Sequence, residues 1–260
     1  MRRLPKWPAR VLPAVVAFAL FGVIWQIVAD HTQSIVPTLG SLSSALRANP
    51  HLLLEDGART LRESIVGLLA GFGAAFVLAV AMSEVRLLER AVMPLAVVLN
   101  VTPLVAIAPG LGLAFGFGYS PKYILTAIIV FFPFLVNASI GLRSVEPEVL
   151  NVLSTLRASR FEVLWRLRLP SSLPFLFSAA RICLPLSIVG AVVAEFTASS
   201  YSGQGGLGVL VLTSAQTSQL GLEFAAIFCL AGMGIIYTAV VVICERRLLR
   251  WHVSSRVPRN

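Results

Sequence analysis

The stretch SVEPEVLNVLSTLRASRFEVLWRLRLPSSLP, residues 144–174, is a charged segment within an otherwise apolar chain. Residues 143–168 hold five arginines and three glutamates in 26 positions. These are Arg143, Arg157, Arg160, Arg166 and Arg168, with Glu146, Glu148 and Glu162. Long, nearly uncharged runs flank the segment on both sides, so we expect the rest of the chain to hold it between apolar helices.

The composition indicates a membrane protein. Hydrophobic residues make up 57% of the chain, charged residues only 13%, and the mean hydropathy is +0.85, which lies outside the soluble range. A helix that crosses a hydrocarbon core of about 30 Å needs roughly 20 apolar residues at about 1.5 Å each, and several windows reach that length. The expected fold class is therefore all-α and polytopic. The net charge of +9 does not indicate nucleic-acid binding, because no basic, aromatic-interleaved patch stands apart from the apolar segments.

We expect about six transmembrane helices. Their predicted ranges are 11–29, 64–82, 89–113, 123–142, 173–196 and 224–244. The first is too long for a signal peptide and lacks a small-residue cleavage pattern. In the second, Gly67, Gly71 and Gly73 are predicted to let a neighbouring helix approach closely. The third holds several prolines and is predicted to be broken.

Three segments are predicted to lie outside these helices. Residues 42–54 form an amphipathic piece that suits a surface helix. The sequence GLGLAFGFGYSP, residues 110–121, is predicted to be a loop. Residues 198–222 are polar but uncharged, which suits a loop with a re-entrant or surface helix.

The basic residues are distributed unequally between alternate sides. Of the 21 lysines and arginines, 16 lie on the side of the charged segment and four on the other, while Arg181 alone lies inside a span. The four are Arg47, Arg59, Arg62 and Lys122. Because basic loops are retained in the cytoplasm, this bias predicts that both termini and the charged segment are cytoplasmic.

The charged segment itself has helical periodicity. Apolar residues recur at helical spacing over 148–156 and again over 161–169, which predicts two short amphipathic helices joined near 157–159 and ended by Leu169 and Pro170. One interpretation is a solvated loop on the lipid headgroups. The other is a docking element whose amphipathic helix enters a groove of a partner.

Metal and thiol chemistry is not indicated. Cys183, Cys229 and Cys244 lie in apolar runs without C-x-x-C spacing, and the three histidines are scattered. We therefore expect no metal site and no catalytic residues.

The charged segment resembles the cytoplasmic "EAA" loop of permease subunits of binding-protein-dependent ABC importers, whose pattern is E-A-A, three residues, G, nine residues, I-x-L-P. Aligned on Leu169-Pro170, Asn151-Val152-Leu153 occupy the E-A-A positions, Arg157 the glycine and Leu167 the isoleucine. Arg157-Ala158-Ser159, LPSSLPF and Ala180-Arg181 resemble neighbouring family motifs. VVAEF (192–196), GGLGVLV (205–211) and ERRLLRWH (245–252) resemble the subgroup for nitrate, sulfonates, taurine, bicarbonate or vitamin precursors.

The resemblance covers residues 59–252 and implies a single permease domain over 1–260 in a bacterial inner membrane. Its parts are a peripheral first helix (11–29), a core (59–246), a cytoplasmic coupling loop (144–170) and a cytoplasmic tail (247–260). It also implies two ABC ATPase subunits that bind ATP and Mg, a second permease subunit, expected to be identical, and an external solute-binding protein. The absence of a G-x-x-x-x-G-K-[ST] phosphate loop fits an ATP site on another chain.

The resemblance assigns ATPase coupling to twelve residues. These are Glu148, Asn151, Val152, Leu153, Leu156, Arg157, Ala158, Ser159, Phe161, Trp165, Leu169 and Pro170. Arg157 departs from the family pattern, because a glycine between two helices usually supplies a left-handed turn that costs other residues roughly 1 kcal/mol or more. Either the turn differs here, or Arg157 makes a compensating contact.

Polar residues within the spans are candidates to line the transport path. They are Asn100, Thr102, Asn137, Arg181, Ser187 and Glu195. For Arg181 the alternative is a structural tie to a neighbouring helix or to backbone carbonyls, and for the hydroxyl and amide side chains it is a bond within their own helix. Two other protein classes remain open at this point: a stand-alone secondary transporter or channel, and a membrane enzyme.

Overall fold

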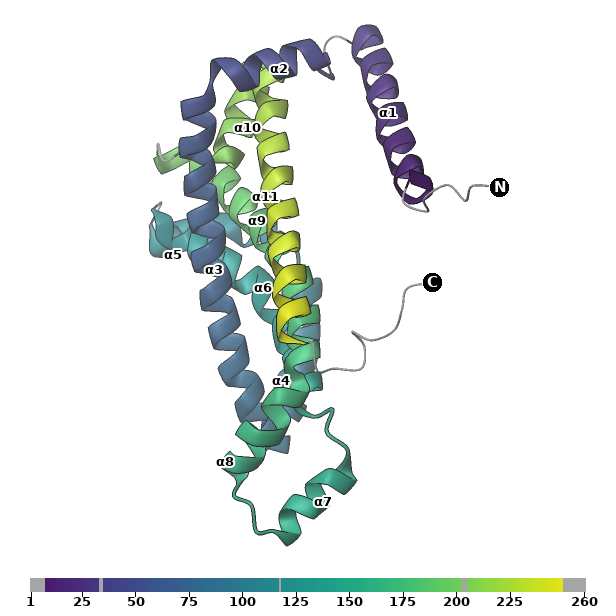
Figure 1. Ribbon diagram of the computed structural model, residues 1–260. Coiled ribbons are helices and arrows are strands. Elements are labelled where there is room, and N and C mark those ends of the chain that lie inside the picture. Colours follow the sequence, from purple (N-terminus) through teal and green to yellow (C-terminus); the bar gives the residue numbers. More distant parts are fainter. Residues whose placement is uncertain (1–7, 33–34, 117, 203–204, 250–260) are drawn as a thin grey trace, which may run out of the picture.

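The computed structural model describes residues 8–32, 35–116, 118–202 and 205–249 (Figure 1). Within these ranges the chain is helical and contains no strand. Four helices are long and apolar enough to cross a membrane: Pro50–Glu84, Tyr119–Leu142, Arg160–Thr197 and Leu220–Leu248. Val15–His31 and Leu207–Gln216 are shorter apolar helices. The prediction of an all-α polytopic membrane protein is confirmed.

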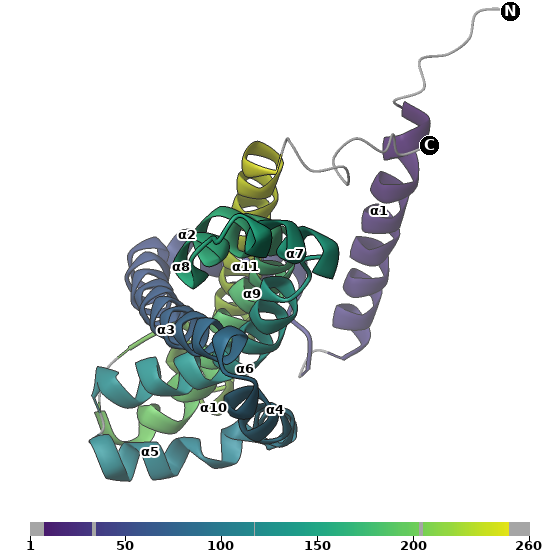
Figure 2. The ribbon, with the colours of Figure 1, turned by 90° about the horizontal axis from the view of Figure 1, so that it is seen from below.

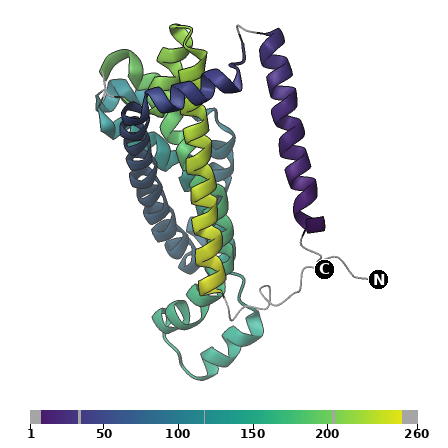
Figure 3. The ribbon, with the colours of Figure 1, turned by 45° about the horizontal axis from the view of Figure 1, so that its top comes forward.

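The helices run between two ends of an elongated bundle. α1 (Pro8–His31) stands apart from the others in Figures 1 and 3, and α2 (Leu39–Ala48) crosses one end. The long helices are α3 (Pro50–Glu84), α6 (Tyr119–Leu142), α9 (Leu169–Ser202) and α11 (Leu220–Leu248), with α10 (Leu207–Gln216) near α2. α7 (Pro147–Thr155) and α8 (Arg160–Val163) lie at the other end, called here the loop end.

The centre of the bundle is the packing of α6 against α3 and α9. A Cβ atom at Gly67 would lie 2.4 Å from Thr126 Cβ, and one at Gly71 would lie 2.5 Å from Val130 Cγ2. These two glycines therefore permit the close approach predicted from the sequence, whereas Gly73 has open space beside it. Towards the loop end, Phe72 and Phe134 stack with their ring centroids 4.0 Å apart.

The amphipathic piece predicted at 42–54 is divided between two helices. α2 ends at Ala48, and α3 begins at Pro50, where a proline without an N–H group suits the first turn of a helix. From there α3 continues through the second predicted span to Glu84. The prediction of one surface helix over 42–54 was wrong. The long helix begins at Pro50, before the apolar run of the second predicted span, 64–82.

The third predicted span is broken, as its prolines indicated. It consists of α4 (Arg86–Val101), the 3₁₀ turn η1 (Leu104–Ala106) and α5 (Ala108–Phe115), with the break at Pro103. The loop predicted at 110–121 was wrong at both ends, because α5 includes Gly110 to Phe115 and α6 begins at Tyr119. Pro109 stands in the first turn of α5 and favours a helix start there.

The largest correction concerns Leu169 and Pro170, which do not end a helix. α8 passes into a π-helical turn, η2 (Leu164–Arg168), and then directly into α9. Proline lacks an N–H group, and in an α-helix its ring would meet the carbonyl four residues earlier, here that of Arg166. In η2 the Leu169 N–H donates to the Leu164 carbonyl five residues back, so the widened turn accommodates the proline.

Candidate functional site

The loop of residues 144–170 is ordered by two capping arrangements. At the end of α7, Arg157 has a φ of 55°, and the Ala158 N–H donates to the Leu153 carbonyl at 3.1 Å. This is the left-handed ending in which glycine is preferred. The predicted turn is therefore present, with arginine in the position where the family pattern has glycine. Figure 2 shows α7 and α8 across the loop end.

The second arrangement is a capping box at the start of α8. Ser159 Oγ accepts a hydrogen bond from the Glu162 N–H at 3.2 Å, and the Glu162 carboxylate accepts from the Ser159 N–H at 3.0 Å and from its hydroxyl at 3.1 Å. These bonds from the Ser159 backbone and side chain lower the pKa of Glu162 below its usual value. The loop is thus two helices joined by a defined turn, as predicted.

Apolar side chains of this loop are left open to the surroundings. Leu156 is 72% exposed, Phe161 69% and Trp165 55%, and Val152 is also exposed. The rings of Phe161 and Trp165 lie 5.9 Å apart. We call these four residues the exposed loop face. Large apolar side chains gathered in this way are typical of a surface that binds a partner.

The other predicted coupling residues lie around the exposed loop face and differ in exposure. Glu148, Asn151, Ser159 and Arg157 lie at exposed positions, while Leu153, Ala158 and Pro170 are half-buried. Leu169 packs against the main apolar core. The exposed loop face is therefore attached to the bundle through the junction between η2 and α9.

Two arginines fasten the loop to the junction between α3 and α4. Arg168 bonds the Glu84 carboxylate at 2.9 Å and the Ser83 carbonyl at 3.1 Å. Arg143 pairs with Glu89 and donates to the Met82 carbonyl. These pairings could not be found from the sequence, because they join residues about 54 to 85 positions apart in the chain.

Most of the path candidates bond either to a neighbouring helix or to a backbone carbonyl of their own helix. Arg181 of α9 pairs with Glu245 of α11, which corresponds to the interhelical alternative. Asn137 donates to the Pro133 carbonyl at 2.8 Å, Ser187 to that of Leu184 at 2.7 Å, and Thr102 to that of Val98 at 3.0 Å. Asn100 lies at an exposed position of α4.

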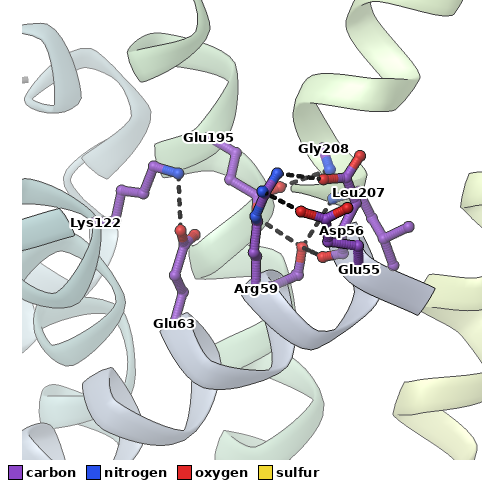
Figure 4. Close-up of polar contacts among 9 residues, drawn as sticks. Glu55, Asp56, Arg59, Glu63, Lys122, Glu195, Leu207 and Gly208 are labelled. Atoms are coloured by element: carbon purple, nitrogen blue, oxygen red, sulfur yellow. Dashed lines mark hydrogen bonds and ion pairs between the residues drawn. The ribbon is translucent and has the colours of Figure 1, made fainter. Parts of the chain in front are cut away.

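Glu195, the sixth path candidate, is fully buried in a polar cluster (Figure 4), near the end of α9 that lies away from η2. Its carboxylate accepts hydrogen bonds from the Thr60 hydroxyl at 2.7 Å and from the Gly208 N–H at 2.5 Å. The Leu207 N–H donates to Thr60 Oγ1 at 2.9 Å. Glu195 therefore fastens the first turn of α10 to α3 and α9, where a carboxylate also suits the positive end of the helix dipole.

The glycines before and within α10 make this contact possible. A Cβ atom at Gly206 would lie 2.1 Å from Glu195 Oε1, and one at Gly208 would lie 2.6 Å from Oε2. Gly206 also has a φ of 151°. The VVAEF and GGLGVLV motifs are thus two halves of one contact, which gives a physical reason for their residue types.

Beside Glu195, the Lys122 ammonium group of α6 bonds Glu63 Oε1 of α3 at 2.7 Å, and both side chains are fully buried (Figure 4). Nearer the surface, Arg59 pairs with Asp56 at 3.0 Å and with Glu55 at 2.5 Å. Sequence reasoning counted Lys122 as a loop charge and missed Glu63 and Thr60. One sequence signal could have indicated this cluster: the charged residues of 55–63 recur at helical spacing just before the second predicted span.

Comparison with known proteins identifies the family. Residues 67–250 match the family described as "Binding-protein-dependent transport system inner membrane component". A probable ABC transporter permease protein of Haemophilus influenzae is 31% identical over 229 residues, which cover 87% of this chain and 92% of that protein. The riboflavin transport system permease protein of Chloroflexus aurantiacus is 32% identical over 256 residues, 96% of this chain and 92% of that protein.

Among solved structures, the methionine ABC transporter MetNI in an inward-facing conformation is similar in fold. The TM-score is 0.62 at 17% identity, over 76% of this chain and 95% of that chain. The comparisons support an importer permease and not the alternative of a stand-alone transporter or channel. The chain therefore belongs to the inner-membrane permease subunits of binding-protein-dependent ABC transporters.

Proposed function

We propose that this permease subunit couples solute import to ATP hydrolysis on a separate subunit through the loop of residues 144–170. The observation that carries the proposal is the exposed loop face, whose half on α8 and η2 is continuous with the transmembrane helix α9. A partner that moves Phe161 or Trp165 acts directly on a helix that crosses the bundle. The twelve predicted coupling residues remain assigned to this role.

The partners follow from the family. Two ABC ATPase subunits would bind ATP and Mg and grip the loops of two permease chains, with the second chain identical to the first. A solute-binding protein would deliver the solute to the opposite end of the bundle. Amphipathic helices with apolar anchors commonly bind in such grooves.

The orientation is supported by the positions of the basic residues. Arg86 and Arg90 lie in the first turns of α4, beside the Glu84 and Glu89 contacts of Arg168 and Arg143, whereas Arg59 lies towards the start of α3 and Lys122 in the first turn of α6. This arrangement agrees with a cytoplasmic loop and cytoplasmic termini in a bacterial inner membrane. The predicted tail, 247–260, lies almost wholly outside the described residues. Reporter fusions at either terminus test the orientation, and an extracytoplasmic signal would contradict it.

The solute class we propose is a small oxyanion or a vitamin precursor. The proposal rests on the subgroup motifs, including VVAEF and GGLGVLV, and on the similarity to the riboflavin system permease. Path-lining remains proposed for the six polar candidates. Asn100 and Thr102 are favoured among them, because backbone groups freed at the Pro103 break are satisfied by protein or by a water-lined cavity.

The coupling proposal is tested by truncating the exposed loop face. Phe161→Ala and Trp165→Ala should each weaken binding of the cognate ATPase by about thirtyfold, the effect of losing a central aromatic anchor of ~2 kcal/mol. Phe18→Ala is the control, because Phe18 is also an exposed aromatic residue, 79% exposed, but lies in α1 outside the loop. ATPase copurification and solute-stimulated hydrolysis provide the readouts. Unchanged binding in both loop variants would contradict the proposal.

A further inference from the structure

The buried cluster contains more acidic than basic groups. Glu63, Lys122 and Glu195 come from α3, α6 and α9, and each is fully buried. With all three ionised, two carboxylates face a single ammonium group, which leaves one uncompensated negative charge. An unpaired charge in such a site is strongly disfavoured and is normally neutralised.

The neighbouring charges do not supply the missing positive charge. Arg59 pairs with Asp56 and Glu55, so that group also carries one carboxylate more than its cation balances. Arg62 lies over the Tyr119 ring, 5.4 Å from its centroid, and among the described residues it forms no ion pair with Glu63 or Glu195. The neighbours that hydrogen-bond within or beside the cluster are neutral. They are the Thr60 hydroxyl of α3, the Leu207 and Gly208 N–H groups of α10, and the Ser64–Tyr237 hydroxyl pair that joins α3 to α11.

One oxygen in the cluster has no donor. Glu63 Oε1 accepts from Lys122, but Glu63 Oε2 is buried and without a hydrogen-bond partner among the described residues. Thr60, which lies one turn before Glu63 on the same face of α3, donates to Glu195 Oε1 at 2.7 Å, so the Glu63 and Glu195 carboxyl groups are neighbours in the cluster. Two ionised carboxylates are both acceptors, so the contact is favourable only when one of them carries a proton.

We propose that Glu63 and Glu195 bind a single proton between them, which gives Glu63 Oε2 its hydrogen bond and makes the group with Lys122 electrically neutral. The proton is the ligand of this site, and a metal cation does not fit, because the Lys122 ammonium group already holds the remaining carboxylate oxygen at 2.7 Å. As in other carboxylate pairs, the proton belongs to the pair and not to one residue.

The role of the shared proton is to complete the junction of four helices. Glu195 fastens α10, Lys122 brings in α6, and the bond between Glu63 and Glu195 joins α3 to α9. Lys122 lies in the first turn of α6 and Glu195 near the last turns of α9, so the junction is at the ends of these helices that lie away from the exposed loop face. It is independent of the ATPase contact, so its test does not depend on transport.

The test is infrared spectroscopy of the full-length permease in lipid nanodiscs at neutral pH. We expect a carbonyl stretching band of a protonated carboxylic acid, which shifts when glutamate is labelled with heavy carbon. The label separates glutamate from Asp56, which is buried nearby. Absence of a label-sensitive band in folded wild-type protein would overturn the proposal without the need for any variant.

Two single variants distinguish a shared proton from an ordinary buried acid. In Glu63→Gln or Glu195→Gln, the charge of the one glutamate that remains balances the charge of Lys122. The new glutamine amide donates the hydrogen bond that the shared proton made in the wild-type protein. Each variant should therefore fold and lose the whole band, whereas Glu162→Gln, at an exposed position, should keep it. If the carboxylic acid band persists in Glu63→Gln or in Glu195→Gln, the proton is not shared between the two glutamates.

Discussion

At the scale of single residues, Arg157 shows how backbone geometry constrains the coupling loop. It holds a φ of 55° at the end of α7 and lies at an exposed position. The left-handed conformation brings Cβ close to the following carbonyl and is unfavourable for residues other than glycine. The loop therefore keeps the shape of the family turn in spite of the substitution.

Replacement of Arg157 by glycine should stabilise the permease. Relief of the left-handed strain predicts a gain of about 1 kcal/mol in the free energy of unfolding. Thermal unfolding in detergent measures it, with Arg157→Ala as the control, because alanine removes the guanidinium group but keeps Cβ. If glycine is no more stable than alanine, the strain is absent. If glycine also weakens ATPase binding, Arg157 makes the compensating contact with the partner.

The capping box of α8 should depend on pH. Ser159 lowers the pKa of Glu162 in the folded loop. The stability that the ionised Glu162 carboxylate adds to the loop is therefore complete above its ordinary pKa of 4.5, and it is lost as the pH falls through the lower pKa of the folded state. Hydrogen exchange of the Ser159 and Glu162 amides should accelerate over that range. In Glu162→Gln, where the amide preserves the box but does not titrate, the acceleration should be absent.

At the scale of elements, the π-helical turn decides how the loop is connected. The sequence indicated both short helices correctly, because amphipathic periodicity is a local signal. The sequence also predicted that the second helix ends at Leu169 and Pro170, because proline usually breaks an α-helix. The continuity of α8, η2 and α9 depends on the wider turn and on the packing of Leu164 and Leu169 against the core, which no local pattern contains.

Pro170→Ala should convert η2 into ordinary α-helix. Alanine restores an N–H group that bonds the Arg166 carbonyl, and loss of the extra residue per turn would rotate α8 by about 100° relative to α9. Spin labels at Phe161 and at an outer position of α3 would detect the rotation as a changed distance. Pro174→Ala is a matched control, because Pro174 lies in the first turns of α9 beyond η2. An unchanged distance in Pro170→Ala would show that the turn does not depend on the proline.

At the scale of the whole molecule, the helical class, the long spans and the broken third span could be predicted from the sequence. Hydropathy and proline placement are signals within each segment. The Glu63–Lys122–Glu195 cluster could not be predicted, because its members are 59 residues or more apart and their burial depends on how α3, α6 and α9 meet. Glu195 was identified only as a polar residue in a span.

The packing of the whole bundle should be sensitive to one glycine and tolerant at another on the same helix. Gly71→Ala places a Cβ 2.5 Å from Val130 Cγ2 and 2.6 Å from the Ala127 carbonyl oxygen, so α3 and α6 must separate. We expect a loss of about 1–3 kcal/mol, as for overpacked cores. Gly73→Ala has open space and should gain up to about 1 kcal/mol from helix propensity. Equal thermal stabilities would contradict the close contact.

The continuity of α8 with α9 makes one helix a mechanical link between two distant sites. The run from Arg160 to Thr197 has 38 residues, so at about 1.5 Å per residue it is about 57 Å long. Phe161 lies at one tip and Glu195 at the other. Pro174 and Pro185 lie between them, and each leaves one backbone carbonyl of the helix without its usual N–H donor. We therefore expect a displacement of Phe161 to bend the helix at these two positions, while the segment beyond Pro185 stays attached to α10 through Glu195.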